Sequence, residues 1–196
     1  MKKLSLVLLL LFLVESCFAN DKKYVEELFF KKIDEVILVI NNKALDKEKR
    51  NSEIVKLLEP IFDFELMAKL SLGKKWFTLS KEEQSEFVKL YVQRMKKSYS
   101  SKLDAYSGQK IEITDIAQPK SNRVILASNL VASDSTFEVV YKFYKPKEQI
   151  KAKELWVIYD VEIQGVSILK TDRAQFSEYL QQNSILELMQ LLAKNN

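Results

Sequence analysis

The sequence predicts an α+β domain in which a curved antiparallel sheet of about four strands carries helices on its apolar face. Three observations support this class. Apolar residues recur with helical spacing up to about residue 106, alternate with polar ones between residues 110 and 163, and return to helical spacing after residue 171. The chain has 196 residues, is 47% hydrophobic and shows no internal repeat, so we expect one domain with one core.

The first residues, Met1–Ala19, have the pattern of a secretory signal peptide. Two lysines precede an apolar run, and Cys17 and Ala19 are the small residues of a small-x-small cleavage site. The run is too short for an ordinary membrane-spanning helix. We therefore expect an exported protein whose mature domain covers residues 20–196. In the less favoured alternative Cys17 is acylated, as in a lipoprotein, but the acidic Glu15 argues against this.

Three helices are expected before residue 75. The range Asp21–Lys43 carries a wide apolar stripe and should bury one face. Asp46 has the chemistry of an N-cap for a second helix that extends through Glu59. A short third helix should lie between an Asp63 cap and Gly73, which can adopt the left-handed conformation that closes a helix. We interpret Asp63 as a structural cap rather than a catalytic acid.

A long helix should follow the capping box of Ser80 and Glu83, whose side chains accept hydrogen bonds from each other's backbone amides. Its apolar stripe steps by four along Phe87, Tyr91, Met95, Tyr99 and Leu103. Such a stripe can pack in the core, or it can line a cavity mouth with tyrosine hydroxyls at a wet edge. Two helices should end the chain, one over Asp172–Gln181 and one begun by a second capping box of Ser184 and Glu187.

Four strands are expected after residue 109, joined by short links that favour antiparallel pairing. They are Lys110–Ala117, Arg123–Ala132, Thr136–Lys145 and Glu154–Ile163. On the third strand one face carries Phe137, Val139, Tyr141 and Phe143. One side of the sheet should therefore be bulky and apolar.

The last of these strands also has two unlike faces. One carries Leu155, Val157, Tyr159, Val161 and Ile163, and the other carries Trp156, Ile158, Asp160 and Glu162. We expect the uncharged set to share the apolar face of the sheet. After this strand, Gly165 predicts a bulge or sharp bend. Val166 and Ile168 should then resume the strand before Thr171 and Asp172 open a helix.

Two absences in the composition exclude several classes of catalytic and metal site. The chain has no histidine, which excludes Ser-His-Asp and Cys-His catalysis and histidine-bound zinc. The single cysteine, Cys17, lies in the predicted leader, so the mature domain offers no disulfide and no thiolate metal site. We expect no catalytic residue, no metal and no cofactor. The net charge of +4 is mild and no basic run alternates with aromatic residues, so we expect no nucleic-acid partner.

A curved sheet that faces amphipathic helices encloses a cone lined by apolar side chains. These side chains either fill the cone, which would leave a partner-binding module, or surround an apolar ligand. An isomerase on the same cone, with Asp160 or another carboxylate as base and a tyrosine as electrophile, is a further alternative. It is disfavoured because the apolar faces of the last two strands contain no acid.

Two blocks of sequence carry a resemblance to a known family. FDFELMAKLSLGKKW begins at Phe62, and WVIYDVEIQGVSILKTDRAQF begins at Trp156. Both resemble, in the same order, segments of the MlaC family of periplasmic phospholipid-binding proteins, also known as toluene-tolerance auxiliary proteins. The matched positions are Phe62, Asp63, Phe64, Met67, Ala68, Leu72, Gly73 and Trp76, followed by Trp156, Asp160, Val161, Gly165, Val166, Ser167, Arg173 and Phe176.

The resemblance implies a cone similar to that of nuclear transport factors, with a pocket for the acyl chains of a glycerophospholipid and the headgroup at its mouth. It implies a periplasmic carrier rather than an enzyme. Such a carrier shuttles phospholipid between an outer-membrane lipoprotein–porin complex and an inner-membrane ABC transporter, and so maintains outer-membrane lipid asymmetry. We expect a monomer. A carrier of another amphiphile, such as lipoprotein acyl chains, is the alternative.

The lipid-binding pocket should be lined by apolar and aromatic side chains from both halves of the chain. These are Phe64, Met67, Leu70, Leu72, Trp76, Tyr91, Met95, Tyr99, Val139, Tyr141, Trp156, Tyr159, Val161, Val166 and Ile168. A second set should be structural: Asp63, Gly73, Asp160, Gly165, Arg173 and Phe176. Within this set, we expect Asp160 and Arg173 to form an ion pair rather than a headgroup site.

Overall fold

The computed structural model of the chain describes residues 2–103 and 109–195, with side chains described for residues 20–98 and 109–194. Its strands are β1 (Lys110–Lys120), β2 (Arg123–Val131), β3 (Thr136–Tyr144), β4 (Val157–Ile163) and β5 (Val166–Ser167). Its helices are α1 (Lys2–Ile40), α2 (Lys47–Leu58), α3 (Phe64–Leu72), α4 (Lys81–Leu103), α5 (Ile168–Tyr179) and α6 (Ile185–Asn195), with the 3₁₀ segments η1 (Glu59–Ile61) and η2 (Gly73–Thr78). The predicted α+β class is confirmed, with five antiparallel strands in the order β1-β2-β3-β4-β5 instead of about four.

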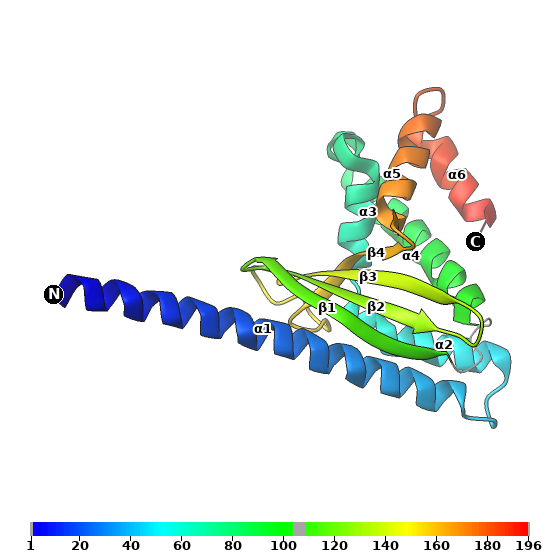
Figure 1. Cartoon of the computed structure of the whole chain (residues 1–196). Helices are drawn as coiled ribbons and strands as arrows, with labels where there is room; N and C mark the ends of the chain where they lie inside the picture. Colours follow the sequence, from blue (N-terminus) through cyan, green and yellow to red (C-terminus); the bar gives the residue numbers. More distant parts are fainter. Residues whose placement is uncertain (1, 104–108, 196) are drawn as a thin grey trace.

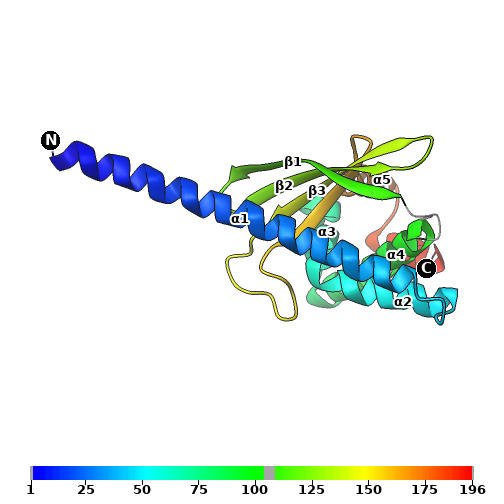
Figure 2. The ribbon, with the colours of Figure 1, turned by 60° about the horizontal axis from the view of Figure 1, so that its bottom comes forward.

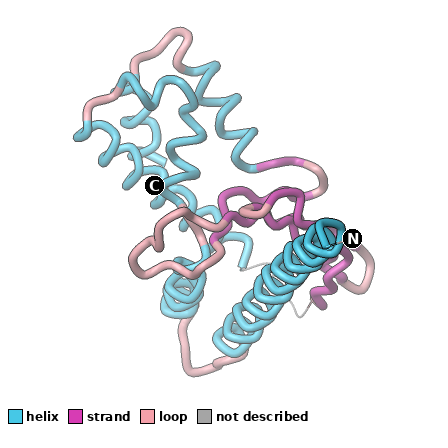
Figure 3. The backbone as a smooth tube through the Cα atoms, turned by 90° about the vertical axis from the view of Figure 1, so that its left-hand side faces the viewer, coloured by secondary structure: helices cyan, strands magenta, loops and turns pink. Residues whose placement is uncertain are grey.

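The helices lie on two sides of the sheet (Figure 1). Helix α1 runs lengthwise along one face and contacts β1 and β2, whereas α3 and α5 contact β4. Figure 3 shows the strands between α1 and a second helical group. This group consists of α3, α4, α5 and α6, which pack on one another. We call the face of the sheet towards α1 the inner face and the opposite face the outer face.

The inner face is apolar. The rings of Phe29 in α1 and Tyr141 in β3 meet with centroids 4.8 Å apart, which assigns Tyr141 to this face. Because directly opposite residues of paired strands share a face, the strand register gives the other members. They are Ile111, Ile113, Ile116, Val124, Leu126, Ser128, Leu130, Phe137, Val139, Phe143, Ile158, Val161 and Ile163. Several of them, such as Leu126 and Ile158, are at most 1% exposed and join Val25 of α1 in the core.

A β-bulge at Tyr159 changes the facing of β4. The pairing with β3 steps past Tyr159, which has no partner in the ladder. The inserted residue brings Ile158 and Val161 to the same face although they are three positions apart in the chain. The expectation that Val157 and Tyr159 share the apolar face with Val161 is therefore wrong, as is the placement of Ile158 on the opposite face, because strict alternation does not survive an inserted residue.

The chain reverses direction after β4 instead of bending. Gln164 and Gly165 both have positive φ, at 52° and 75°, and they form the two-residue turn of a hairpin in which Ile163 pairs with Val166. Two successive positive φ values match the twist of paired strands, which explains why the chain takes a sharp turn here, the second of the two predicted possibilities, and not a bulge. The short β5 then leads directly into α5.

Helix α5 begins earlier than predicted. Ser167 is its N-cap and accepts a hydrogen bond from the backbone amide of Lys170 at 3.0 Å. Ile168 is therefore the first helical residue and does not continue a strand. Thr171 and Asp172 lie inside the helix, where Asp172 is buried, so the predicted start at these two residues is wrong. Serine at the cap satisfies the first-turn amides better than a position farther along would, which fixes the earlier start.

The other predicted caps are confirmed. Asp46 accepts a hydrogen bond from the Lys49 amide at 2.9 Å and begins α2. Asp63 accepts from the Leu66 amide at 2.9 Å and begins α3. The two capping boxes form as expected, with the Ser80 amide 2.8 Å from its glutamate and the corresponding amide before α6 at 2.7 Å.

Helix α1 covers most of the predicted helix Asp21–Lys43, but it starts farther upstream and ends three residues earlier, at Ile40. In the part of the chain that the structure describes, no helix is both long enough and apolar enough to cross a membrane.

Candidate functional site

Burial along the inner face changes steadily from one end to the other. At the closed end, Val124 of β2 and Phe143 of β3 are fully buried. At the open end, Leu130 of β2 is only half-buried and Phe137 of β3 is 43% exposed. Val166, which pairs with a residue of this face at the hairpin, is 60% exposed. The same apolar surface thus passes from a sealed core to an open edge within the length of the strands.

Helix α1 shows the same change in burial. Val25 is fully buried and Phe29 is 4% exposed, so the helix is sealed against the closed end. Towards its C-terminus lie the consecutive apolar residues 36–40, none of which is fully buried, and Leu38 is 73% exposed. Figures 1 and 2 show this part of α1 beside the start of β1 and the end of β2, which is the open end of the sheet. An apolar surface of α1 and one of the sheet therefore face each other without sealing.

Tyr141 and Ser128 provide polar atoms in the middle of the inner face. Burial raises the pKa of the Tyr141 phenol to about 12, an effect that a hydrogen bond with Ser128 partly opposes. Part of the Tyr141 side chain nevertheless remains accessible. The Ser128 hydroxyl also donates to the Val139 carbonyl at 3.3 Å. By accessible surface, Tyr141 is therefore only half-buried, unlike its neighbour Phe143.

The chemistry of the inner face suits the binding of apolar groups. As defined above, its members carry no charged side chain, and its polar side-chain atoms are the hydroxyls of Ser128 and Tyr141. A ligand there would be held by removal of apolar surface from water and by close contact, with two hydroxyls available at one point.

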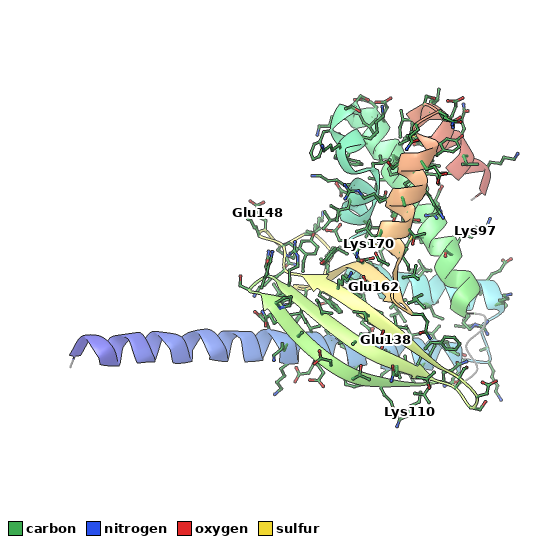
Figure 4. The ribbon with its side chains drawn as sticks, turned by 45° about the horizontal axis from the view of Figure 1, so that its top comes forward. Lys97, Lys110, Glu138, Glu148, Glu162 and Lys170 are labelled. Atoms are coloured by element: carbon green, nitrogen blue, oxygen red, sulfur yellow. The ribbon has the colours of Figure 1, made fainter. Side chains whose placement is uncertain are left out.

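Asp160, the carboxylate considered as a base, lies on the outer face and is 3% exposed. It accepts hydrogen bonds from the Ser167 hydroxyl at 2.8 and 2.9 Å and from the Leu169 amide at 3.2 Å. Its ionic partner is Lys142, with Nζ at 3.1 Å, and this lysine also contacts Glu162. Figure 4 looks onto this face, on which Glu162 is labelled. Asp160 therefore ties β4 to the start of α5 and does not face the apolar surface.

The expected ion pair between Asp160 and Arg173 is wrong. Because the strand register places Lys142 directly opposite Asp160, the lysine is the nearer cation to this carboxylate. Arg173 instead lies against Gly73, where a Cβ atom would be 3.1 Å from its guanidinium nitrogens. Gly73 adopts φ of 55° at the end of α3, which a residue with a side chain rarely does.

Two open clefts lie elsewhere on the described surface. One, of about 490 Å³, lies between α4, α5 and α6 and includes Arg94 and Leu191. The other, of about 480 Å³, lies beside α3 and includes Asp63 and Lys69. Both mix charged with apolar side chains, and neither includes a residue of the inner face. We take the inner face as the candidate site because it is uniformly apolar and opens gradually to the surface.

Comparison with known proteins identifies the family. The family model described as MlaC protein matches residues 31–194. The chain belongs to the MlaC family. A search of the curated proteins found no match. Among solved structures, the chain is similar to the phospholipid-binding protein from Ralstonia solanacearum in complex with a phospholipid, with 18% sequence identity and a TM-score of 0.73 over 86% of this chain and 94% of that one. At this identity the likeness establishes a common fold.

The predicted pocket residues of this MlaC-family chain fall into separate places. Val139, Tyr141 and Val161 lie on the inner face, with Val166 at its open edge. Most of the others lie in the core: Phe64, Met67, Leu72, Trp76, Tyr91, Met95 and Trp156 are at most 7% exposed, and Leu70 and Ile168 are half-buried. Tyr159 lies on the outer face, and the side chain of Tyr99 lies outside the described residues.

Tyr159 packs against an aromatic and a cationic side chain on the outer face. Its ring meets that of Tyr144 with centroids 5.9 Å apart, and the Arg123 guanidinium lies over both rings at 5.3 and 5.2 Å. Tyr144 in turn donates a hydrogen bond to the Asp63 carboxylate, which with burial raises the pKa of the phenol. Asp63 is thus a cap that also joins α3 to β3.

Sequence reasoning missed part of the inner face. Ile111, Ile113 and Leu130 belong to it, as do the half-buried apolar residues near the end of α1. Two signals could have found them. The first is the alternation in the first two strands, and the second is the apolar run 36–40, which exceeds what one buried helical face requires.

Proposed function

We propose that this chain is a carrier that binds a glycerophospholipid, with the acyl chains on the inner face against α1 and the headgroup at the open end. The observation that carries the proposal is the change in burial along one uncharged apolar face, from the sealed Val124 to the exposed Phe137. Membership of the MlaC family and the likeness to a phospholipid-binding protein support it. The same observations support a binding role rather than an enzymatic one.

The energetics favour a carrier over free diffusion. Two acyl chains contain roughly 30 methylenes, and at about 0.8 kcal/mol for each one a phospholipid in water lies on the order of 20 kcal/mol above its place in a bilayer. An apolar surface closed by α1 removes most of that cost. Because bilayer and protein interior are both apolar, transfer between them can be nearly balanced and reversible, and the direction is then set by the proteins on either side.

We further propose that the protein works in the periplasm as a monomer and moves phospholipid between an outer-membrane lipoprotein–porin complex and an inner-membrane ABC transporter. Its role would be to maintain outer-membrane lipid asymmetry. The family match and the signal-peptide pattern of Met1–Ala19 support this placement.

The test is mass spectrometry of the mature protein purified without detergent, first in the native state and then after extraction with organic solvent. We expect a mass increment that resolves into an intact two-chain phospholipid. A different extracted amphiphile, such as a lipoprotein acyl chain, would replace the proposed ligand. A protein that is empty and takes up no lipid from phospholipid vesicles would refute the carrier function.

A further inference from the structure

The η2 turn holds one aromatic residue in solvent. Phe77 is 74% exposed, whereas its neighbour Trp76 is 7% exposed and belongs to the core. Helix α4 holds the turn in place, because the side-chain amide of its residue Gln84 donates to the Trp76 carbonyl at 3.1 Å and to the Leu79 carbonyl at 3.3 Å. Phe77 is thus exposed by a built turn rather than by a loose loop, and its ring forgoes the free energy that burial would give.

Cationic side chains lie on and beside the turn that carries this ring. The Lys69 Nζ lies 5.5 Å from the centroid of the Phe77 ring. The Arg173 guanidinium arrives from α5 and lies against Gly73 at the start of the same turn. Two further lysines of the turn are exposed. We define the Phe77 patch as Lys69, Lys74, Lys75, Phe77 and Arg173.

The charge of the Phe77 patch is not balanced within the described structure. None of its four cations forms an ion pair with a described residue; the acids nearest in sequence are Glu65, which lines the same cleft as Lys69, and Glu82. Lysines elsewhere on the helices are commonly paired, as Lys56 is with Glu53 and Lys89 with Glu86. Neighbouring cations repel one another, so their grouping around an apolar ring favours an anionic partner.

We propose that the Phe77 patch docks an acidic segment of a partner protein. Phe77 contacts an apolar side chain of that segment, and the four cations pair with its carboxylates. Arg173 suits a bidentate pair with one carboxylate, whereas the lysines accelerate the encounter by long-range attraction. The inference rests on the proposed function in one respect, since a carrier must meet the proteins that supply and receive its lipid.

The position of the patch favours a protein over an anionic bilayer. In Figure 1 the η2 turn lies at the top of the helical group, at the far end of α3 from the sheet, while the open end of the inner face lies at the lower right beside the end of α1. A bilayer bound through the patch would hold the open end away from the membrane. A protein partner does not impose this orientation, because it can bind the helical group and leave the open end accessible.

The experiment is site-specific photo-cross-linking in living cells, with Phe77 replaced by p-benzoylphenylalanine. We expect a cross-link to one protein whose contacted peptide, identified by mass spectrometry, carries clustered Asp or Glu beside an apolar residue. The double substitution Lys74→Glu with Lys75→Glu should lower the cross-linking yield about tenfold or more. Changing the identified acidic residues to lysine should restore it. The matched control, Lys43→Glu with Lys120→Glu, has the same change in charge at exposed sites outside the patch and should leave the yield unchanged.

The inference is overturned by a cross-link to phospholipid alone, by a contacted peptide without acidic residues, by no cross-link at all, or by a yield that charge reversal in the patch leaves unaffected. Lipid content is measured on the same variants. A variant that loses cross-linking but keeps its lipid tests the patch alone. A wild-type protein that contains no lipid contradicts the carrier function alone. The two failures can therefore be distinguished.

Discussion

Val139 lies on the inner face where burial begins to decrease, and its replacement by tryptophan separates a filled core from a binding cavity. Its cross-strand neighbours are Ser128, which is 1% exposed, and Ile163, which is half-buried. If side chains fill the space in front of Val139, an indole there must displace them. If the space holds a ligand, the indole takes the place of part of that ligand.

The two cases predict different losses of stability and of lipid affinity. Overpacking a filled core costs about 1–3 kcal/mol of stability. In an open cavity the lipid-free protein should lose less than about 1 kcal/mol, while an indole that excludes roughly four methylenes weakens lipid binding by about 3 kcal/mol, or about two orders of magnitude. The control is Leu126→Trp on the same face, where the native side chain is fully buried and the overpacking cost applies with or without lipid.

The assay is urea denaturation of delipidated wild type, Val139→Trp and Leu126→Trp, together with the lipid content of each protein as purified. Delipidation is required because bound lipid stabilises the native state by mass action and would hide the difference. We expect Val139→Trp to be stable and to contain less lipid than the wild type. If it is destabilised as strongly as Leu126→Trp, the inner face is filled at this point. If it keeps its lipid, the acyl chains do not lie there.

Three further predictions concern the framework of the site. Asp160→Ala should lower the free energy of unfolding by about 2–4 kcal/mol, because the Ser167 hydroxyl and the Leu169 amide lose their acceptor and Lys142 keeps only Glu162 as an ionic partner; urea denaturation against Asp160→Asn, which keeps the shape, measures this. The pKa of Tyr141 is raised to about 12, so its stabilising contribution is complete below pH 10 and is lost as the pH rises towards 12; between pH 9 and pH 11.5 the free energy of unfolding should therefore fall about 2 kcal/mol less in Tyr141→Phe than in wild type, and an equal fall would contradict the burial argument. Gly73→Ala should cost about 1–2 kcal/mol and displace Arg173, because its φ is 55° and its Cβ would lie 3.1 Å from the guanidinium; an unchanged melting temperature would show that the turn adapts freely.

Features that depend on neighbouring residues were predictable from the sequence. Asp63 and the capping box of Ser80 and Glu83 satisfy backbone amides three positions away, so the pattern of residue types alone identifies them. The two motif blocks identified the family for the same reason, since each is a continuous run of residues. The order of helices and strands follows from periodicity, which is also a local property.

Features that depend on an inserted residue or on distant packing were not predictable. The bulge at Tyr159 shifts every following side chain of β4 by one face, and no residue type near it signals the shift. Gln164 adopts positive φ although it is not glycine, because the hairpin pairing on both sides imposes it. The pairing of Asp160 with Lys142 rather than Arg173 depends on the register between two strands.

The inner face and the Phe77 patch lie at different ends of the molecule, and this separation has a mechanical consequence. A carrier that docked through the rim of its own cavity would have to release its partner to exchange lipid. Docking through the helical group leaves the space between α1 and the sheet free to open while the partner stays bound. Reversal of charge at Lys74 and Lys75 should therefore reduce cross-linking without changing lipid content, and Val139→Trp should do the opposite. In the combined variant the two effects should add, because sites that share no contacts are energetically independent. A reduced cross-linking yield in Val139→Trp alone would mean that lipid occupancy controls docking, and the two ends of the molecule would then be coupled.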